Sequence, residues 1–149
     1  MSLTTDDKKY LERIQQIVRV LREVRDQGRL FDLGLWGTDD LENSDKDFPE
    51  GSCGTVMCAI GWVGLDPWFR RRGFCTTSYA PNNFEPQFSR NGYKDTSWEA
   101  VREFFDMSGT SAHNLFSERD YDEGYTVDDV IHNVQEYIEY TYGDEYVVA

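Results

Sequence analysis

The chain has 149 residues, 39% of them hydrophobic and 15% aromatic, and it carries a formal net charge of −13 at pH 7. Residues 1–149 are expected to form a single domain with a substantial core, and no apolar run is long enough to span a bilayer. The negative charge excludes nucleic acid as a partner, because phosphate groups would be repelled.

The charge is distributed unevenly along the chain. Residues 1–30 hold seven basic and five acidic side chains, whereas residues 111–149 hold one basic and ten acidic ones. Such a surface would steer a protein partner with a basic surface, although plain solubility explains it as well. The N-terminus lacks a signal pattern, and three cysteines are an odd number without the spacing of a disulfide framework. These features predict a cytoplasmic protein.

The first predicted element is an amphipathic helix between Thr4 and Gly28. Thr4 and Thr5 offer hydroxyls for the N-cap, and the acidic side chains of the first turn face the positive end of the helix dipole. Apolar side chains recur at steps of three and four, which is typical of one buried stripe; they are Tyr10, Leu11, Ile14, Ile17, Val18, Leu21 and Val24. Gly28 is expected to end the helix.

Two irregular segments are expected next. Residues 31–36 are apolar with an interleaved glycine, and they predict an extended segment or short turn packed on the core. Residues 38–50 predict an acidic loop. A solvated loop is favoured over a calcium loop of the EF-hand type starting at Asp39, because Leu41 stands where an oxygen ligand is needed and Ser44 where glycine is needed.

The stretch from Gly51 to Trp62 lies in the longest run of the chain without a charged residue. Thr55 can cap a helix, and the following residues to Val63 are apolar on nearly every face, as expected of a helix surrounded by protein. A buried strand is the competing interpretation, since a short apolar run has no diagnostic period. Small residues within the run favour the helix. A second short helix is expected from Pro67 to Arg72.

The cysteines of this stretch are the first candidates for chemistry. Cys53 precedes the predicted helix start, where the N-terminus of a helix can lower the pKa of a thiol and make it reactive. The alternative is that Cys53 and Cys58 are small buried apolar residues. With Cys75 they lack the paired spacing of zinc ligands, so neither a metal nor a cofactor is expected.

Two motifs in the chain form a recognisable pattern. The first, at residues 53–62, reads Cys-Gly-Thr-x-x-Cys-Ala-x-Gly-Trp, and the second, at residues 104–116, reads Phe-Phe-x-Met-Ser-x-x-x-Ala-x-x-Leu-Phe. Together they resemble a family of small uncharacterised bacterial and phage proteins with a Cys-Gly-Thr-x-x-Cys-x-x-Gly core motif. The resemblance spans residues 31–140 and implies no activity, because the family has none assigned. In relatives, histidine is also expected at the position of Trp62. Because tryptophan cannot replace histidine as a metal ligand, its presence here argues against an obligatory metal ligand at this position.

The middle of the chain predicts loops and a small flap. Residues 74–90 contain Pro81 and Pro86, which favour a loop over a helix. Phe74 to Thr77 have strand composition, and Asn91-Gly92 is typical of a hairpin turn. A flap of two or three strands is therefore an open alternative in this region.

Three further helices complete the prediction. Thr96 to Glu99 read as a capping box that opens a helix ending near Met107. A second helix begins at Ser108 or Thr110, and the last begins after Thr126. The run from Asp120 to Tyr125 is calcium-like in composition, but Ile131 falls where an EF-hand needs glutamate. The tyrosine-rich tail from residue 140 is expected to add an edge strand or to fray.

The sequence thus predicts a mainly α protein: one domain of about five helices around a buried central helix, with the β-hairpin flap as an option. Two functions are open. The first is binding of a protein partner without catalysis, suggested by the charge and the aromatic content. The second is a thiol-dependent enzyme using Cys53 or Cys58, with His113 or His132 as the base. His113 lies one step off the inward face of its helix, where a boundary hydrogen bond is the simpler role.

Overall fold

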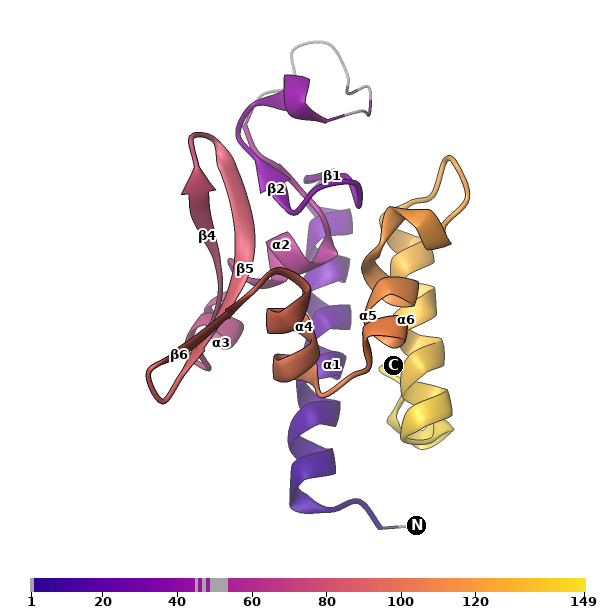
Figure 1. Cartoon of the computed structure of the whole chain (residues 1–149). Coiled ribbons are helices and arrows are strands. Elements are labelled where there is room, and N and C mark those ends of the chain that lie inside the picture. The colour runs from indigo at the N-terminus through magenta and orange to yellow at the C-terminus, as the bar shows by residue number, and fades with distance from the viewer. Residues whose placement is uncertain (1, 45, 47, 49–53) are drawn as a thin grey trace.

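A computed structural model, which describes residues 2–44, 46, 48 and 54–149, has an α+β fold in which helices pack against a six-stranded mixed sheet (Figure 1). The mainly α bundle expected from the sequence is therefore wrong. The helices are α1 (Thr5–Asp26), α2 (Ala59–Val63), α3 (Pro67–Arg70), α4 (Ser97–Phe105), α5 (Gly109–Phe116) and α6 (Val127–Thr141), with 3-10 turns η1 (Leu41–Asn43), η2 (Glu118–Asp120) and η3 (Asp144–Tyr146). The strands are β1 (Leu30–Phe31), β2 (Gly37–Thr38), β3 (Val56–Met57), β4 (Phe74–Ala80), β5 (Asn83–Arg90) and β6 (Tyr93–Thr96).

Helix α1 is the long element to which the rest of the fold is attached. The Thr4 hydroxyl accepts from Asp7 N at 3.0 Å, and the Asp7 carboxylate accepts from Thr4 N at 3.1 Å, so the predicted N-terminal cap is present. Gly28 adopts a left-handed φ of 64° just past the helix end, as predicted. Helix α1 contacts α2, α4 and α6, and Figure 1 shows it between the sheet on one side and α5 and α6 on the other.

The strand order of the sheet is β1-β3-β2-β5-β4, and β6 also pairs with β5. β1 and β3 are parallel, and all the other pairs are antiparallel. β4 occupies one edge of β5. The other edge is shared, because Thr38 of β2 pairs with Asn83 at the beginning of β5 while β6 pairs with Gln87 to Arg90 at its end. The turn at Asn91-Gly92 joins β5 and β6, so the hairpin predicted there is confirmed.

The loop predicted for residues 74–90 is wrong, whereas the strand composition noted for Phe74 to Thr77 is confirmed, since they begin β4. β4 and β5 are the two longest strands of the sheet. Thr76 pairs with Pro86 in register, and the Thr76 N–H points away from β5 to donate to Gly64 O at 3.0 Å. The pair is therefore a non-hydrogen-bonded one, in which the ring nitrogen of Pro86 also faces away from β4. No described strand pairs with β5 at that point of its other edge. Proline can stand inside this strand because it interrupts no hydrogen bond of the ladder.

The central stretch contains less helix than the sequence predicts. Val56 and Met57 form β3, which pairs with β1 on one side and β2 on the other, and α2 begins only at Ala59. Thr55 does not cap the helix; its hydroxyl donates to the Asp39 carboxylate. The cap is Cys58, whose Sγ accepts from Gly61 N at 3.3 Å. Two partner strands satisfy the backbone of residues 56 and 57, so helix is not needed there.

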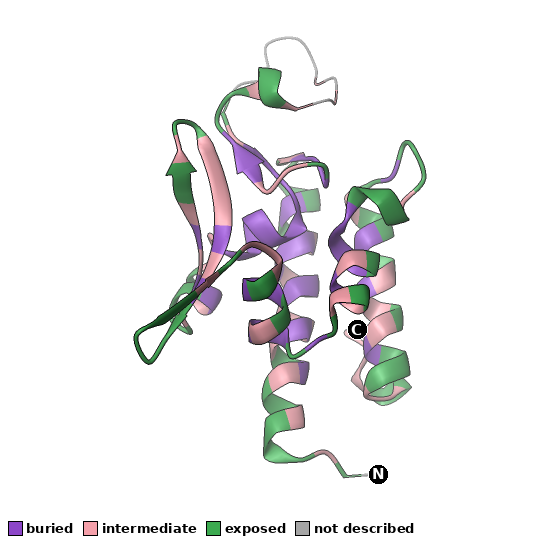
Figure 2. Ribbon diagram, viewed as in Figure 1, coloured by how far each residue is buried: buried purple, intermediate pink, exposed green. Residues whose placement is uncertain are grey.

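The burial predicted for this stretch is confirmed from Val56 to Val63. Every residue of α2 is buried (Figure 2), and two glycines allow its backbone to approach its neighbours. A Cβ on Gly61 would overlap the carbonyl oxygen of Trp36, and one on Gly64 would lie 2.5 Å from Thr76 N. The Thr76 hydroxyl in turn donates to Gly61 O at 2.7 Å. Direct backbone contact thus joins α2 to the β1–β2 turn and to β4.

A cluster of phenylalanines joins the sheet to the helices. Phe104 of α4 lies at its centre, with ring centroids 4.8 Å from Phe74 of β4, 5.1 Å from Phe88 of β5 and 5.8 Å from Phe69 of α3. Phe105 packs against the rings of Phe69, Phe74 and Phe104. Of this cluster only Phe88 retains any exposure, at 5%.

The tail, residues 140–149, adds no strand to the sheet and does not fray, so neither prediction for it is correct. Val147 and Val148 pack on the core. Gln15 of α1 donates to Tyr146 O at 2.9 Å, and Gln135 of α6 both donates to Val148 O and accepts from Val148 N. The tail therefore connects α1 to α6.

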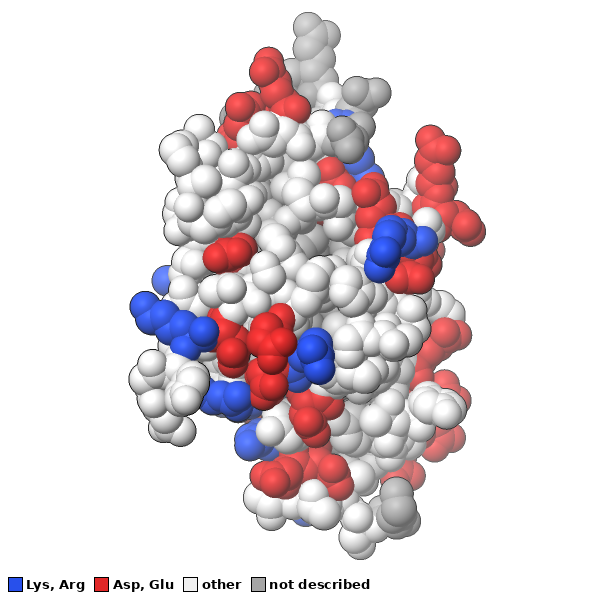
Figure 3. Space-filling model, viewed as in Figure 1, with Lys and Arg blue, Asp and Glu red and all other residues white. Residues whose placement is uncertain are grey.

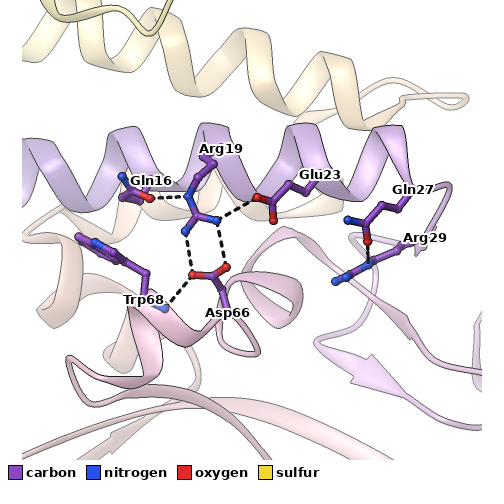
Figure 4. Close-up of polar contacts among 7 residues, drawn as sticks. All are labelled: Gln16, Arg19, Glu23, Gln27, Arg29, Asp66 and Trp68. Atoms are coloured by element: carbon purple, nitrogen blue, oxygen red, sulfur yellow. Dashed lines mark hydrogen bonds and ion pairs between the residues drawn. The ribbon is translucent and has the colours of Figure 1, made fainter.

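An ion pair joins α1 to the start of α3 (Figure 4). The Arg19 guanidinium donates two hydrogen bonds, of 3.1 and 2.8 Å, to the Asp66 carboxylate. Asp66 also caps α3 by accepting from Trp68 N at 3.0 Å. Burial opposes ionisation of Asp66, but the hydrogen bonds and charge of Arg19 outweigh it and hold the pKa of the carboxyl below its usual range.

We expect Asp66→Asn to lower the free energy of unfolding by about 1 kcal/mol at pH 7, because asparagine keeps the cap but loses the ion pair, which is partly screened at the surface. A carboxyl with a lowered folded-state pKa stabilises the protein above its unfolded pKa, about 4. The difference between the two proteins should therefore shrink as the pH falls below about 4. Urea unfolding at a series of pH values measures it.

The matched control is Asp128→Asn. Asp128 forms a 2.9 Å ion pair with Arg25, but its side chain is 63% exposed, so its loss should change stability by less than about 0.5 kcal/mol. A cost for Asp66→Asn that stays constant down to pH 2 would contradict the assigned role of the ion pair.

Candidate functional site

A cleft of about 290 Å³ opens where the β1–β2 turn, the start of α4 and the end of α5 meet. Its lining combines apolar, aromatic and charged side chains from four parts of the chain. The residues are Leu33, Gly34, Leu35, Trp36, Cys58, Trp98, Phe116, Ser117, Glu118 and Arg119. We refer to it as the tryptophan cleft.

The β1–β2 turn that forms one wall is held by a buried carboxylate. Asp32, which is 1% exposed, accepts from Gly34 N at 2.8 Å and also from the hydroxyls of Ser44 and Tyr125. The Tyr125 hydroxyl accepts from Leu33 N at 2.7 Å, and burial raises the pKa of this phenol above its ordinary range. The sequence interpretation missed Asp32, although a charged residue between two apolar ones was a usable signal.

The two tryptophans come from distant parts of the chain and contact each other. The ring centroids of Trp36 and Trp98 are 4.7 Å apart at an interplanar angle of 59°. His113 packs on Trp98 with centroids 3.9 Å apart, and His113 is not part of the lining. Its Nδ1 is buried and has no hydrogen-bond partner among the described residues. His113 therefore supports the Trp98 ring instead of entering the cleft.

Cys58 lines the cleft with only 1% of its surface exposed. Its Sγ accepts from Gly61 N and donates to Trp36 O at 3.5 Å. Burial raises the pKa of the thiol to about 12, so it is protonated at neutral pH, and the thiol form is a poor nucleophile.

The other residues predicted for thiol chemistry do not meet Cys58. Cys53 lies outside the described residues. His132 is on the exposed side of α6, where its Nε2 is 3.0 Å from the Glu136 carboxylate. Within the part of the chain that the structure describes, no histidine is hydrogen-bonded to a cysteine.

Charged side chains stand at the mouth of the cleft. The Glu118 carboxylate and Asp32 Oδ1 lie 2.6 and 3.1 Å from the position that a Cβ would take on Gly34, so the two carboxyl groups are close to each other. Among the described residues, no ion pair involves Asp32, Glu118 or Arg119. The two carboxyl groups on this side of the cleft therefore lie close together, and neither forms an ion pair with a described lysine or arginine.

An acidic surface begins at Glu118 and continues over α6. Its ten carboxylate side chains are all exposed; they are Glu118, Asp120, Asp122, Glu123, Asp128, Asp129, Glu136, Glu139, Asp144 and Glu145. Of these only Asp128 forms an ion pair with an arginine among the described residues. Figure 3 shows acidic atoms along the right-hand margin, the side on which Figure 1 places α6. We refer to these ten residues as the acidic face.

The calcium-like run found in the sequence lies within this face. Residues 120–125 line a second cavity of about 320 Å³, together with Asp129, His132 and Asn133. No three histidine, cysteine or carboxylate residues of the described chain are grouped as metal ligands would be. Tyr140, on helix α6 beside the acidic face, is 94% exposed.

Comparison with protein-family models, with curated proteins and with solved structures gives no match to this chain. None of the helices in the described residues is both long enough and apolar enough to cross a membrane. The resemblance of the two sequence motifs to a bacterial and phage family stays a prediction.

Proposed function

We propose that this protein is a binding module that docks, without catalysis, on a protein partner with a basic surface. The observation that carries the proposal is the acidic face: ten exposed carboxylates within 28 consecutive residues, among which Arg119 is the only lysine or arginine. Charges left without partners in the free protein remain available to a partner of opposite charge.

The acidic face would act mainly on the rate and specificity of association. Long-range attraction raises the rate at which a basic partner arrives and repels polyanions such as nucleic acids. The exposed Tyr140 adds an aromatic contact of the kind that is enriched in interfaces. Both contributions depend on ionic strength, because salt screens exposed charges over about 10 Å at 0.1 M.

The buried, protonated state of Cys58 supports binding over thiol catalysis. A catalytic cysteine needs a thiolate and access to solvent, and Cys58 has neither. Cys58 and Cys75 are both free thiols, which supports a place in the reducing cytoplasm.

The test uses the full chain and a fluorescein-labelled peptide of alternating lysine and glycine as the basic probe. The double variant Glu123→Lys/Glu139→Lys should weaken binding about tenfold at low salt, as measured by fluorescence anisotropy. The control Glu12→Lys/Glu42→Lys makes the same change in net charge at exposed residues outside the acidic face. It should weaken binding about twofold at most. Equal losses in the two variants, or no binding at low salt, would overturn the proposal.

A further inference from the structure

We propose that the tryptophan cleft is the anchor pocket for one lysine or arginine side chain of the basic partner. This inference rests on the proposed function and adds to it the place where the partner is held. It follows from four properties of the cleft: its size, its mixed apolar and aromatic lining, its carboxylates without an ion-pair partner, and its position beside the acidic face.

The size of the cleft limits what can enter it. Ligand pockets usually measure about 300–1,000 Å³, and this one is at the lower end at about 290 Å³. A nucleotide or a large cofactor would exceed it, whereas a single long side chain suits it.

The lining has the two-part character that a long cationic side chain requires. Leu33, Cys58 and Phe116 are buried and contribute apolar surface to the cleft. Lysine and arginine bury their methylene chains on such surfaces and keep the charged group at the polar end. Trp36 and Trp98 add π systems, which attract a cation that lies within about 6 Å of the ring.

The charge of the cleft selects a cation. Glu118 is exposed and Asp32 lies next to Gly34, and neither carboxylate forms an ion pair with a described lysine or arginine. Arg119, the one cation of the lining, is exposed and makes no ion pair with Glu118. A guanidinium or ammonium group entering the cleft would gain a charge-assisted hydrogen bond to Glu118.

The position of the cleft connects it to the acidic face. Glu118 belongs to both, since it lines the cleft and is the first of the ten exposed carboxylates. A basic segment attracted by residues 120–145 would therefore be brought to the mouth of the cleft. Electrostatic attraction would supply the encounter, and the cleft would supply a defined contact in which a buried anchor can form.

The first arm of the test uses single side chains as probes. Nα-acetyl-arginine amide is titrated into ¹⁵N-labelled protein while the indole N–H signals of Trp36 and Trp98 are recorded. We expect both signals to shift with the arginine probe. Nα-acetyl-citrulline amide, which is neutral and of nearly the same shape, should leave them unchanged. An arginine probe that shifts neither signal overturns the anchor pocket, even if the basic peptide binds.

The second arm uses the lysine–glycine peptide with two variants that each remove one exposed carboxylate. Glu118→Gln should weaken peptide binding at least about fivefold, whereas Glu139→Gln, on the acidic face away from the cleft, should weaken it less than about twofold. Equal effects overturn the anchor pocket and leave the proposed function intact. Failure of the unmodified protein to bind the peptide overturns the proposed function, and the arginine titration then decides on the cleft by itself.

Discussion

Replacing Gly64 by alanine is expected to lower the free energy of unfolding by about 3 kcal/mol or more, as overpacking against fixed atoms does. The φ of Gly64 is −69°, so alanine would suit the backbone and the loss would be purely steric. The added Cβ would lie 2.5 Å from Thr76 N and would also overlap the Thr76 hydroxyl. Neither atom can move freely, because both hydrogen-bond to the backbone of residues 61–64.

Urea unfolding followed by circular dichroism measures this loss, with Gly109→Ala as the matched control. Gly109 is the first residue of α5, and the nearest atoms to an added Cβ are 3.9 Å away on the flexible Arg102 side chain. Alanine should be neutral there or stabilise by up to about 1 kcal/mol. A Gly64→Ala protein as stable as the Gly109→Ala protein would show that α2 does not contact β4 in this way.

Phe104→Ala is expected to lower the free energy of unfolding by about 4 kcal/mol, as is usual when a fully buried aromatic ring is removed. The ring contacts phenylalanines of α3, β4 and β5, so its loss would leave a cavity between the sheet and the helices. On its other side the Arg13 guanidinium lies 4.1 Å from the ring centroid, and Arg13 Nη1 donates to Phe104 O at 2.8 Å. Both α1 and the sheet would lose contacts.

Thermal and urea unfolding measure the effect, and Tyr93→Ala provides the comparison. Tyr93 is an aromatic residue of β6 but is 75% exposed, so its removal should cost less than about 0.5 kcal/mol. A loss of less than about 2 kcal/mol for Phe104→Ala would mean that the phenylalanine cluster is not the main contact between the sheet and the helices.

The amphipathic helices were predictable because their signals are local. The stripe of α1 and the caps of α1 and α6 depend on residues three or four positions apart. The capping box of α1 is formed, and at the start of α6 the Asp129 carboxylate accepts from Thr126 N at 2.7 Å. Helix α4 was also placed correctly, although Thr96 makes no side-chain capping bond. Its predicted capping box is therefore wrong while the helix is right, since an apolar face buried on the sheet suffices to hold it.

The sheet was not predictable in the same way. β1, β2 and β3 have two residues each, which is too short for any alternation to appear. Their pairing depends on partners far along the chain, such as Thr38 with Asn83. In β5, Pro86 favoured a loop in the sequence. It is tolerated because its ring nitrogen faces away from β4, and this orientation is known only once the sheet is assembled.

The candidate site was predicted only in part. Cys58 was identified, and it does line the cleft, but as a buried cap for α2. Trp36 and Trp98 are 62 positions apart in the sequence, and neither was recognised as a site residue. Their meeting requires the β1–β2 turn and α4 to be placed by the sheet. Glu118 was counted only as one of many acidic residues, because its position beside Gly34 is set by tertiary packing.

The Thr76–Pro86 pair has a consequence for self-association. Exposed strand edges invite other chains to add strands, which is a common route to aggregation. At this level of the sheet both directions of growth are closed: the outward N–H of Thr76 is already bonded to Gly64 O, and Pro86 has no N–H to offer on the opposite side. At the Thr76–Pro86 pair, neither β4 nor β5 therefore offers a free N–H to a strand of another chain. The end of α2 accounts for this on β4, and the proline accounts for it on β5.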